Sequence, residues 1–278
     1  WYPHVHNILN NSEAGVTLHF IDENADTGPI VAQKKINVYL VAGGKYHDID
    51  YARLEILKLL AEDERIRTKV YQDYKDIGAI TASDFLITYT CDVMPSLDEQ
   101  EALREYVSNG GKWYALHGTN SILRFLDDGQ VSAPRWAPHL METLGSQFIS
   151  HPPIAPYMVE VADIKNPLVK DVEPFEVDDE LYLMDIHGEL DILLHTEEWG
   201  GTTEGFVDSE WEKKRWPVFY IHKVEKGSVL YLTLGHCRGH YDMDPITDYY
   251  PEIEKGSWDV PVFYDLLRRG ISWCKGEL

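Results

Sequence analysis

Histidines stand directly after apolar, strand-forming segments of this sequence. His117 follows the run 113–116, which is rich in aromatic strand formers, and His236 comes just after the run 229–234. In an open parallel sheet, ligands bind in the crevice beyond the carboxyl ends of the strands, so such histidines are placed for chemistry. For any single histidine the alternative is a structural role, in which the ring bonds a backbone carbonyl.

Further polar groups occur at comparable places. His47 and Asp48 lie in a turn opened by two glycines after the first apolar run, and His151 precedes two prolines that stiffen its loop. Glu180 and Tyr182 offer a carboxylate and a phenol on alternate residues, which puts both on one face of an extended chain. Imidazole and carboxyl groups can exchange protons near neutral pH, as hydrolysis, elimination or isomerisation of a sugar requires. The structural alternatives are turn-forming glycines, solvated acids and a hydrogen-bonded loop histidine.

The thiols are not expected to carry the chemistry. Cys91, Cys237 and Cys274 are odd in number and far apart, so neither a disulfide framework nor a thiolate zinc site is indicated. A reducing cytoplasm is the compartment that fits. Residues 235–239 spell Gly-x-Cys-x-Gly after a strand, but they come late in the sheet order, away from the central turn.

Length and charge exclude several classes of partner. The chain has 278 residues and a net charge of −22, from 47 acidic and 25 basic residues. This charge repels phosphates, so nucleic acid and anionic membranes are not expected partners. The sequence contains no apolar run near the about 20 residues needed to span a bilayer.

From residue 36 onward the sequence alternates apolar strands with amphipathic helices. This order predicts one α/β domain over 36–278, with a doubly wound, mostly parallel sheet flanked by helices. His117 would then stand at the sharp turn between a central strand and a following helix. The polar stretch 200–216 is expected to be an irregular insert. The expected strands are 36–42, 67–71, 85–89, 113–116, 157–161, 191–195, 218–222 and 229–234, and the expected helices are 51–62, 96–109 and 260–275.

Residues 1–35 differ from the rest of the chain. The alternating run 15–21, the turn-forming run 22–29 and the apolar run 30–33 predict a β-hairpin extension. Residues 14–23 and 26–30 resemble a segment of a formyltransferase catalytic domain, in which the position of Asp26 holds an aspartate that assists formyl transfer. That family's preceding catalytic Asn and His have no counterpart here, so we interpret 1–35 as a fragment that contributes a hairpin.

The motifs of residues 36–278 together resemble the ThuA-like, or trehalose-utilisation, family. Their order and spacing carry the resemblance, whereas each motif alone is weak. The matching segments are Gly-Gly-x-x-His-Asp at 43–48, Gly-Gly-x-x-x-x-Leu-His-Gly at 110–118, Phe-x-x-His-Pro at 148–152, Asp-Glu-Leu-Tyr at 179–182 and Tyr-Leu-Thr-Leu-Gly-His at 231–236.

The resemblance implies a class I glutamine amidotransferase-like fold, in agreement with the doubly wound pattern. True amidotransferases carry a nucleophilic cysteine where this chain has His117, so glutamine hydrolysis is not expected. The family is associated with the metabolism of disaccharides and their keto forms. We therefore expect an enzyme that acts on a disaccharide or keto-glycoside by His/Glu acid–base chemistry. The alternative is a non-catalytic sugar-binding or regulatory module.

The expected site is one crevice at the sheet edge. We assign catalysis to His117, Glu180 and His236, and substrate binding to His47, Asp48, Asn120, His151 and Tyr182. Neutral imidazoles are common metal ligands, so a divalent ion such as Zn²⁺ on His47, His151 and His236 is a further hypothesis, with Glu180 as fourth ligand or base. The expected partner is a small sugar, and self-association into a homo-oligomer stays open.

Overall fold

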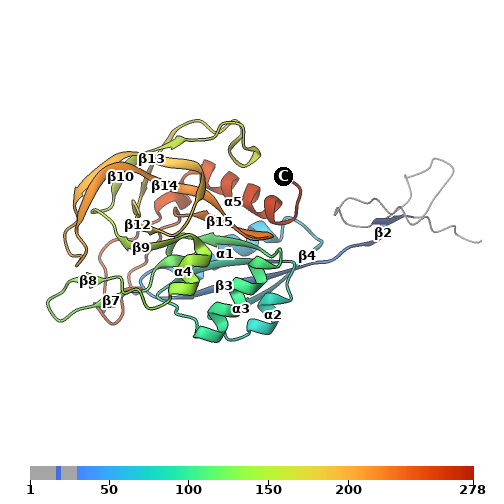
Figure 1. Cartoon of the computed structure of the whole chain (residues 1–278), viewed down its shortest axis with the longest axis horizontal. Helices are drawn as coiled ribbons and strands as arrows, with labels where there is room; N and C mark the ends of the chain where they lie inside the picture. Colours follow the sequence, from blue (N-terminus) through green and yellow to red (C-terminus); the bar gives the residue numbers. More distant parts are fainter. Residues whose placement is uncertain (1–16, 20–29) are drawn as a thin grey trace, which may run out of the picture.

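The computed structural model describes residues 17–19 and 30–278. Its centre is a nine-stranded mixed sheet, and helices pack on both faces of this sheet (Figure 1). The strand order across the sheet is β11 (Phe175–Asp179), β10 (Ala155–Val161), β13 (Leu190–Thr202), β14 (Glu210–Val224), β15 (Gly227–Leu232), β6 (Lys112–Leu116), β5 (Phe85–Cys91), β3 (Ile36–Gly44) and β4 (Ile66–Tyr71).

The sheet has a parallel half and an antiparallel half. The parallel half consists of β15, β6, β5, β3 and β4. The antiparallel half continues from β15 through β14, β13, β10 and β11. The carboxyl ends of β6, β5 and β3 therefore meet at one edge, as a ligand site of an α/β sheet requires. The predicted doubly wound α/β fold is confirmed.

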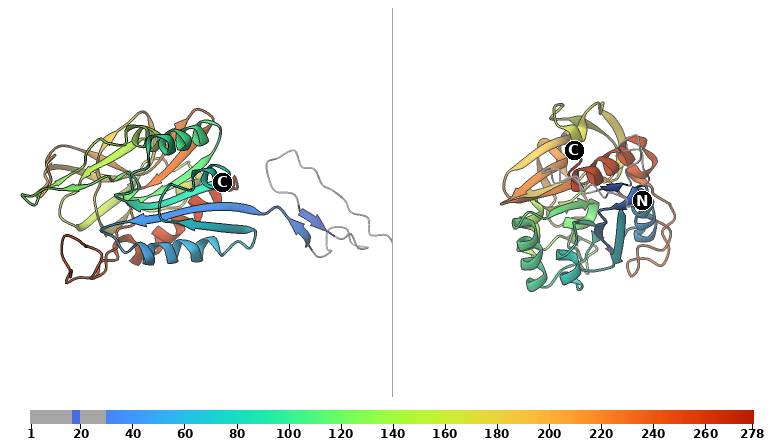
Figure 2. Two further views of the ribbon diagram at one scale, coloured as in Figure 1. Left: turned by 90° about the horizontal axis from the view of Figure 1, so that it is seen from below. Right: turned by 90° about the vertical axis from the view of Figure 1, so that its right-hand side faces the viewer.

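Two helical layers cover the sheet because its strands are apolar on both faces. Val38 and Leu40 of β3 pack in the core under α1 (Ile49–Leu60) and α5 (Pro261–Cys274). Tyr39 and Val41 of the same strand point to the opposite face of the sheet, where they pack in a second hydrophobic core. Figure 2 shows these two layers on either side of the sheet. The second layer consists of α2 (Ile77–Thr81), α3 (Leu97–Ser108) and α4 (Pro138–Leu144).

Capping residues mark the starts of α1 and α3. Ser96 caps α3 by accepting from the backbone N–H of Glu99, and the Glu99 side chain returns a bond to Ser96 N–H. This is the predicted capping box. Asp48 caps α1 through the N–H of Tyr51 at 3.0 Å. Among the described residues, no helix has the length and apolarity that a bilayer crossing demands.

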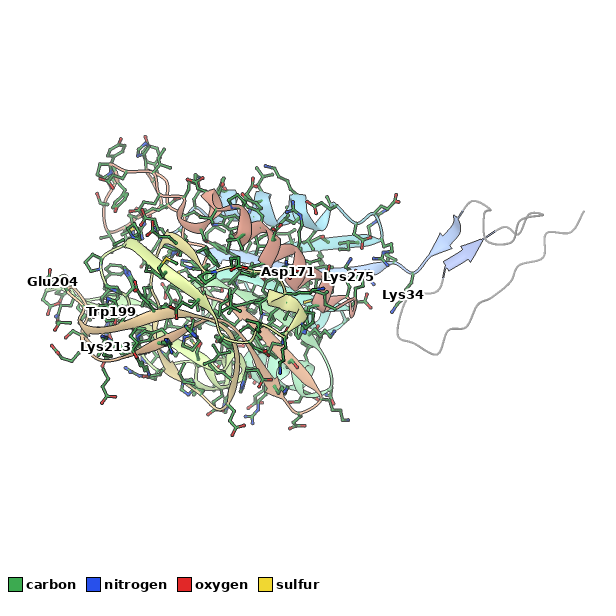
Figure 3. All side chains as sticks on the ribbon, turned by 90° about the horizontal axis from the view of Figure 1, so that it is seen from above. Lys34, Asp171, Trp199, Glu204, Lys213 and Lys275 are labelled. Atoms are coloured by element: carbon green, nitrogen blue, oxygen red, sulfur yellow. The ribbon has the colours of Figure 1, made fainter. Side chains whose placement is uncertain are left out.

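The expectation of an irregular insert at 200–216 was wrong. Strands β13 and β14 run through this stretch as a long antiparallel ribbon, and only 203–209 connect them. Trp199, Glu204 and Lys213 mark its tip, at the end of the molecule away from Lys34 (Figure 3). Much of this ribbon is exposed on both faces, so its sequence lacks the alternation that marks a half-buried strand.

Smaller strand pairs complete the structure. Strands β9 (Ser146–Ser150) and β12 (Leu183–Ile186) pair beside the large sheet, as do β7 (Arg124–Phe125) and β8 (Val131–Ser132). The predicted N-terminal hairpin has its two strands, β1 (Thr17–His19) and β2 (Ile30–Gln33), in antiparallel pairing. Its turn and Asp26 lie outside the described residues.

Candidate active site

Three imidazoles and one carboxylate converge beyond the carboxyl ends of the parallel strands. His47 follows β3, His117 follows β6, His236 follows β15, and Glu180 follows β11. All are buried, and one ligand atom from each lies within 4.8 Å of those of the others. We call His47, His117, Glu180 and His236 the imidazole–carboxylate cluster.

Short contacts connect the members of the cluster. His117 Nε2 lies 2.8 Å from His47 Nε2, and Glu180 Oε2 lies 3.5 Å from the first and 3.8 Å from the second. His236 Nδ1 lies 3.1 Å from Glu180 Oε1. The carboxylate of Glu180 therefore faces every imidazole of the cluster.

The backbone at His117 has the geometry of a nucleophile elbow. His117 has φ of 45°, in the left-handed region, and begins the short 3₁₀ helix η1 (His117–Asn120) directly after β6. Such a turn lifts the side chain away from the sheet edge. Its Nδ1 lies 2.8 Å from the carbonyl oxygen of Thr233, which holds the ring in one orientation.

Asp179 positions Glu180 and His236 through hydrogen bonds to the backbone. Its buried carboxylate accepts from the backbone N–H groups of Glu180 at 2.7 Å, Gly235 at 3.1 Å and Ser257 at 2.9 Å, and from His236 N–H at 3.3 Å. One side chain thus ties the loop after β11 to the loop after β15. Glu180 and His236 keep their mutual position because of this bond set.

We therefore expect Asp179→Ala to lower the free energy of unfolding by at least about 3 kcal/mol, since each buried N–H left unpaired costs about 1–3 kcal/mol. Urea unfolding of the variant and the wild type measures the difference. Asp178→Ala, at the exposed neighbouring position of β11, is the control and should change the value by less than about 0.5 kcal/mol. Equal effects of the two changes would contradict this role.

Arg238 and Glu254 surround His236. His236 Nε2 lies 2.7 Å from Glu254 Oε2, and the Arg238 guanidinium lies 2.8 Å from the same oxygen. Arg238 also approaches Glu180 Oε1 at 3.7 Å. Sequence reasoning missed both residues. Arg238 could have been found from the sequence, because it lies two residues after His236. Glu254 lies in a segment without a motif, so no sequence signal indicated it.

Burial and neighbouring charges act on these groups in opposite directions. Burial lowers the pKa of His47 and holds the pKa of His117 well below its usual range. Burial alone would lower the pKa of His236 too, but the carboxylates of Glu180 and Glu254 raise it to about 9. Burial would raise the pKa of Glu180, yet His236 and His151 together hold it well below its usual range. The site therefore keeps Glu180 ionised.

A cavity of about 270 Å³ opens onto the cluster. One of its walls is aromatic: the rings of Phe148 and Tyr182 have centroids 4.6 Å apart, and Phe206 lies 6.1 Å beyond Phe148. Further apolar side chains line it, among them Leu123, Val131 and Met243. The polar groups at the cavity include His47, His151, Glu180, Arg238 and Ser121. Such a cavity suits a ligand with one apolar face and a polar rim.

The residues expected at the site occupy three kinds of position. His117 and His236 lie in the cluster, whereas His151 lies at the cavity wall with Nε2 3.7 Å from Glu180 Oε1. Asp48 caps α1 and does not line the cavity. Asn120 is fully buried and does not line the cavity, and its amide donates to Ser146 Oγ at 2.7 Å. His151, which was expected among the metal ligands, is not among the clustered donors, and His117 is among them instead.

The cysteines have no activated thiol. Burial raises the pKa of Cys237 to about 12 and holds the pKa of Cys91 well above its usual range. Cys237 Sγ lies 3.3 Å from the hydroxyl of Tyr89 and 3.4 Å from the carbonyl oxygen of Asp48, so it packs inside the protein. A thiolate nucleophile needs the opposite environment, electropositive and partly open.

These features define an α/β protein of the class I glutamine amidotransferase-like kind, with a histidine in place of the elbow cysteine. Residues 35–250 match the family model of ThuA, described as trehalose utilisation. The chain belongs to this family, which connects it with carbohydrate metabolism.

Solved structures agree on the fold. A putative ThuA-like protein from Parabacteroides merdae is 17% identical, with a TM-score of 0.62 over 87% of this chain and 90% of that one. Another, from Bacteroides uniformis, is 16% identical, with a TM-score of 0.58 over 86% and 91%.

A separate match concerns a formyltransferase. A stretch of 35 residues, 13% of this chain, is 46% identical to the dTDP-4-amino-4,6-dideoxyglucose formyltransferase of Mycobacterium tuberculosis. This stretch spans only 15% of the length of that enzyme. The predicted resemblance to a formyltransferase is thus confirmed for a short fragment.

Proposed function

We propose that this protein is an enzyme that transfers a proton beside the ketone of a keto-glycoside, such as the keto form of a disaccharide. The observation that carries the proposal is the cavity itself, with aromatic rings on one wall and His47, His151 and Glu180 on the polar side. At about 270 Å³ it lies just below the about 300–1,000 Å³ usual for ligand pockets. One sugar ring would fill it, and the second ring would extend toward solvent.

His151 is the group that we assign to proton transfer. Its Nδ1 lies 2.7 Å from the carbonyl oxygen of Pro152, which only accepts, so Nδ1 carries the hydrogen and Nε2 keeps a lone pair. The C–H bond beside the ketone breaks and its proton goes to His151 Nε2. The electron pair of that bond forms the C=C bond of an enolate, and the π pair of the C=O bond moves onto the ketone oxygen. Arg238, which also lines the cavity, supplies positive charge for that oxygen.

Glutamine hydrolysis does not fit this site. The elbow residue is His117, and the thiol of Cys237 is buried with a pKa of about 12. Expulsion of the second sugar by elimination, or return of the proton to another carbon as an isomerisation, are the two outcomes open to the enolate.

The test follows a keto-disaccharide by NMR in D₂O with the purified protein. We expect deuterium at the carbon beside the ketone, and a rate about 10²–10⁴-fold lower in His151→Ala. His195→Ala is the matched control, because His195 also bonds a neighbouring carbonyl through Nδ1, at 2.9 Å, but does not line the cavity. Saturable binding of the sugar without exchange would contradict the enzyme and favour a sugar-binding module.

A further inference from the structure

Two nitrogen lone pairs face each other inside the imidazole–carboxylate cluster. His117 Nδ1 lies 2.8 Å from the carbonyl oxygen of Thr233, and His47 Nδ1 lies 3.3 Å from that of Lys45. A carbonyl oxygen only accepts, so both Nδ1 atoms carry hydrogen in the neutral rings. Both Nε2 atoms then present lone pairs, and these atoms are 2.8 Å apart. Lone pairs at this distance repel unless a cation lies between them.

His236 adds a third nitrogen that faces the cluster. Its Nε2–H donates to Glu254 Oε2 at 2.7 Å, so Nδ1 is the nitrogen left to bind a cation, either a second proton or a metal ion. This Nδ1 is buried, has no hydrogen-bond partner among the described residues, and lies 3.1 Å from Glu180 Oε1. An unpartnered buried nitrogen beside a carboxylate oxygen also calls for a cation.

A single proton would satisfy only part of this arrangement. Protons would have to occupy two places, one between His47 Nε2 and His117 Nε2 and one on His236 Nδ1 toward Glu180 Oε1, which puts two positive charges into one buried cluster. A metal ion accepts all four donors at once. Donors bound to one zinc ion at about 2.0–2.2 Å stand about 3–4 Å apart. The contacts of Glu180 with His47, His117 and His236 are 3.8, 3.5 and 3.1 Å, and the His47 and His117 nitrogens, at 2.8 Å, lie just below this range.

We propose that His47 Nε2, His117 Nε2, His236 Nδ1 and the Glu180 carboxylate bind one divalent transition-metal ion. Three imidazoles and a carboxylate suit Zn²⁺ and its first-row neighbours, whereas Mg²⁺ and Ca²⁺ take mainly oxygen ligands. The hydrogen bonds to Thr233, Lys45 and Glu254 are outer contacts of the kind that orient metal-binding histidines.

The proposed metal site is inferred from the donor geometry alone and does not depend on the proposed function. If both hold, the ion lies at the floor of the cavity, because His47 and Glu180 line it. There it would act as a Lewis acid on the ketone oxygen of the sugar. His151 stays outside the ligand set and free for proton transfer.

The experiment measures metal in protein purified without a histidine tag, before and after chelation and reloading with Zn²⁺ or Co²⁺. We expect one ion per chain, and Co²⁺ should give visible absorption bands of a nitrogen-ligated site. The bound ion and the Co²⁺ absorption bands should both be lost in His117→Ala and in His236→Ala. The control is His222→Gln, since His222 is a buried histidine whose ring nitrogens each lie 3.1 Å from backbone carbonyls outside the cluster.

Glu254→Gln provides a milder test that leaves every ligand in place. Loss of its charge behind His236 should weaken Zn²⁺ or Co²⁺ binding by about 10–100-fold, as changes to outer contacts of metal sites do. A wild-type protein that binds neither ion, or one whose bound ion survives both histidine substitutions, would overturn the proposal. A bound ion without keto-sugar turnover would instead contradict only the proposed function.

Discussion

Replacing Glu180 by Gln is expected to lower kcat/KM for a keto-glycoside by at least about 10³-fold, within the range that acid–base and electrostatic groups contribute. The Glu180 carboxylate lies within 3.1–3.8 Å of His236, His117 and His47. It is also 3.7 Å from His151 and from Arg238. Glutamine keeps the shape of the side chain but removes the charge that all these groups face.

We expect Glu180→Gln to remain folded, because glutamine fills nearly the same volume as glutamate and keeps the packing of the buried site. Steady-state kinetics and a thermal melt of the same preparation measure the two effects. Glu252→Gln is the control, since Glu252 is an exposed acid two residues from Glu254 and should leave kcat/KM unchanged within about twofold. A folded Glu180→Gln variant with more than a tenth of wild-type activity would remove Glu180 from the site.

Replacing Gly44 by Ala is expected to cost at least about 4 kcal/mol of unfolding free energy, in the range of severe core overpacking plus backbone strain. Gly44 has φ of 110°, and a Cβ there would lie 1.8 Å from the carbonyl oxygen of Cys91. Strands β3 and β5 would have to separate at their carboxyl ends. His47 comes three residues later, so the cluster would also lose its geometry.

Gly110 offers a matched control because it has the same φ of 110°, but no described atom lies within 4 Å of its Cβ position. Gly110→Ala should therefore show the cost of the backbone conformation alone, about 1–3 kcal/mol. Chemical unfolding of both variants separates strain from overlap. Equal losses would show that the close approach at Gly44 contributes nothing.

Much of the fold could be predicted because its signals are local. The apolar runs that became β3, β5, β6 and β15 and the apolar positions of α1 and α5 have the periods of strands and helices. The capping box at Ser96 placed the start of α3 within a residue. The predicted strands 191–195 and 218–222 lie inside β13 and β14, but the outer part of this ribbon was missed, since a strand pair exposed on both faces has no apolar alternation.

Part of the site also followed from local signals, because parallel strands place their carboxyl ends at one edge. This rule placed His47, His117 and His236 near one another, and the structure brings them together. It did not distinguish Asp48, which caps a helix, or Asn120, which bonds Ser146, from residues that line the cavity. A residue type at a strand end states which chemistry is available there, but not where the side chain points.

The sequence by itself determined the alternation of strands and helices, the histidines at strand ends and the absence of a cysteine at the elbow. Only the tertiary structure decided that His117 rather than His151 joins His47, that Glu180 faces all of them, and that Glu254 supports His236. The physical reason is that these contacts join residues as far apart as 133 positions, such as His47 and Glu180. Their distances depend on how the loops after four strands pack together, and no local pattern encodes that packing.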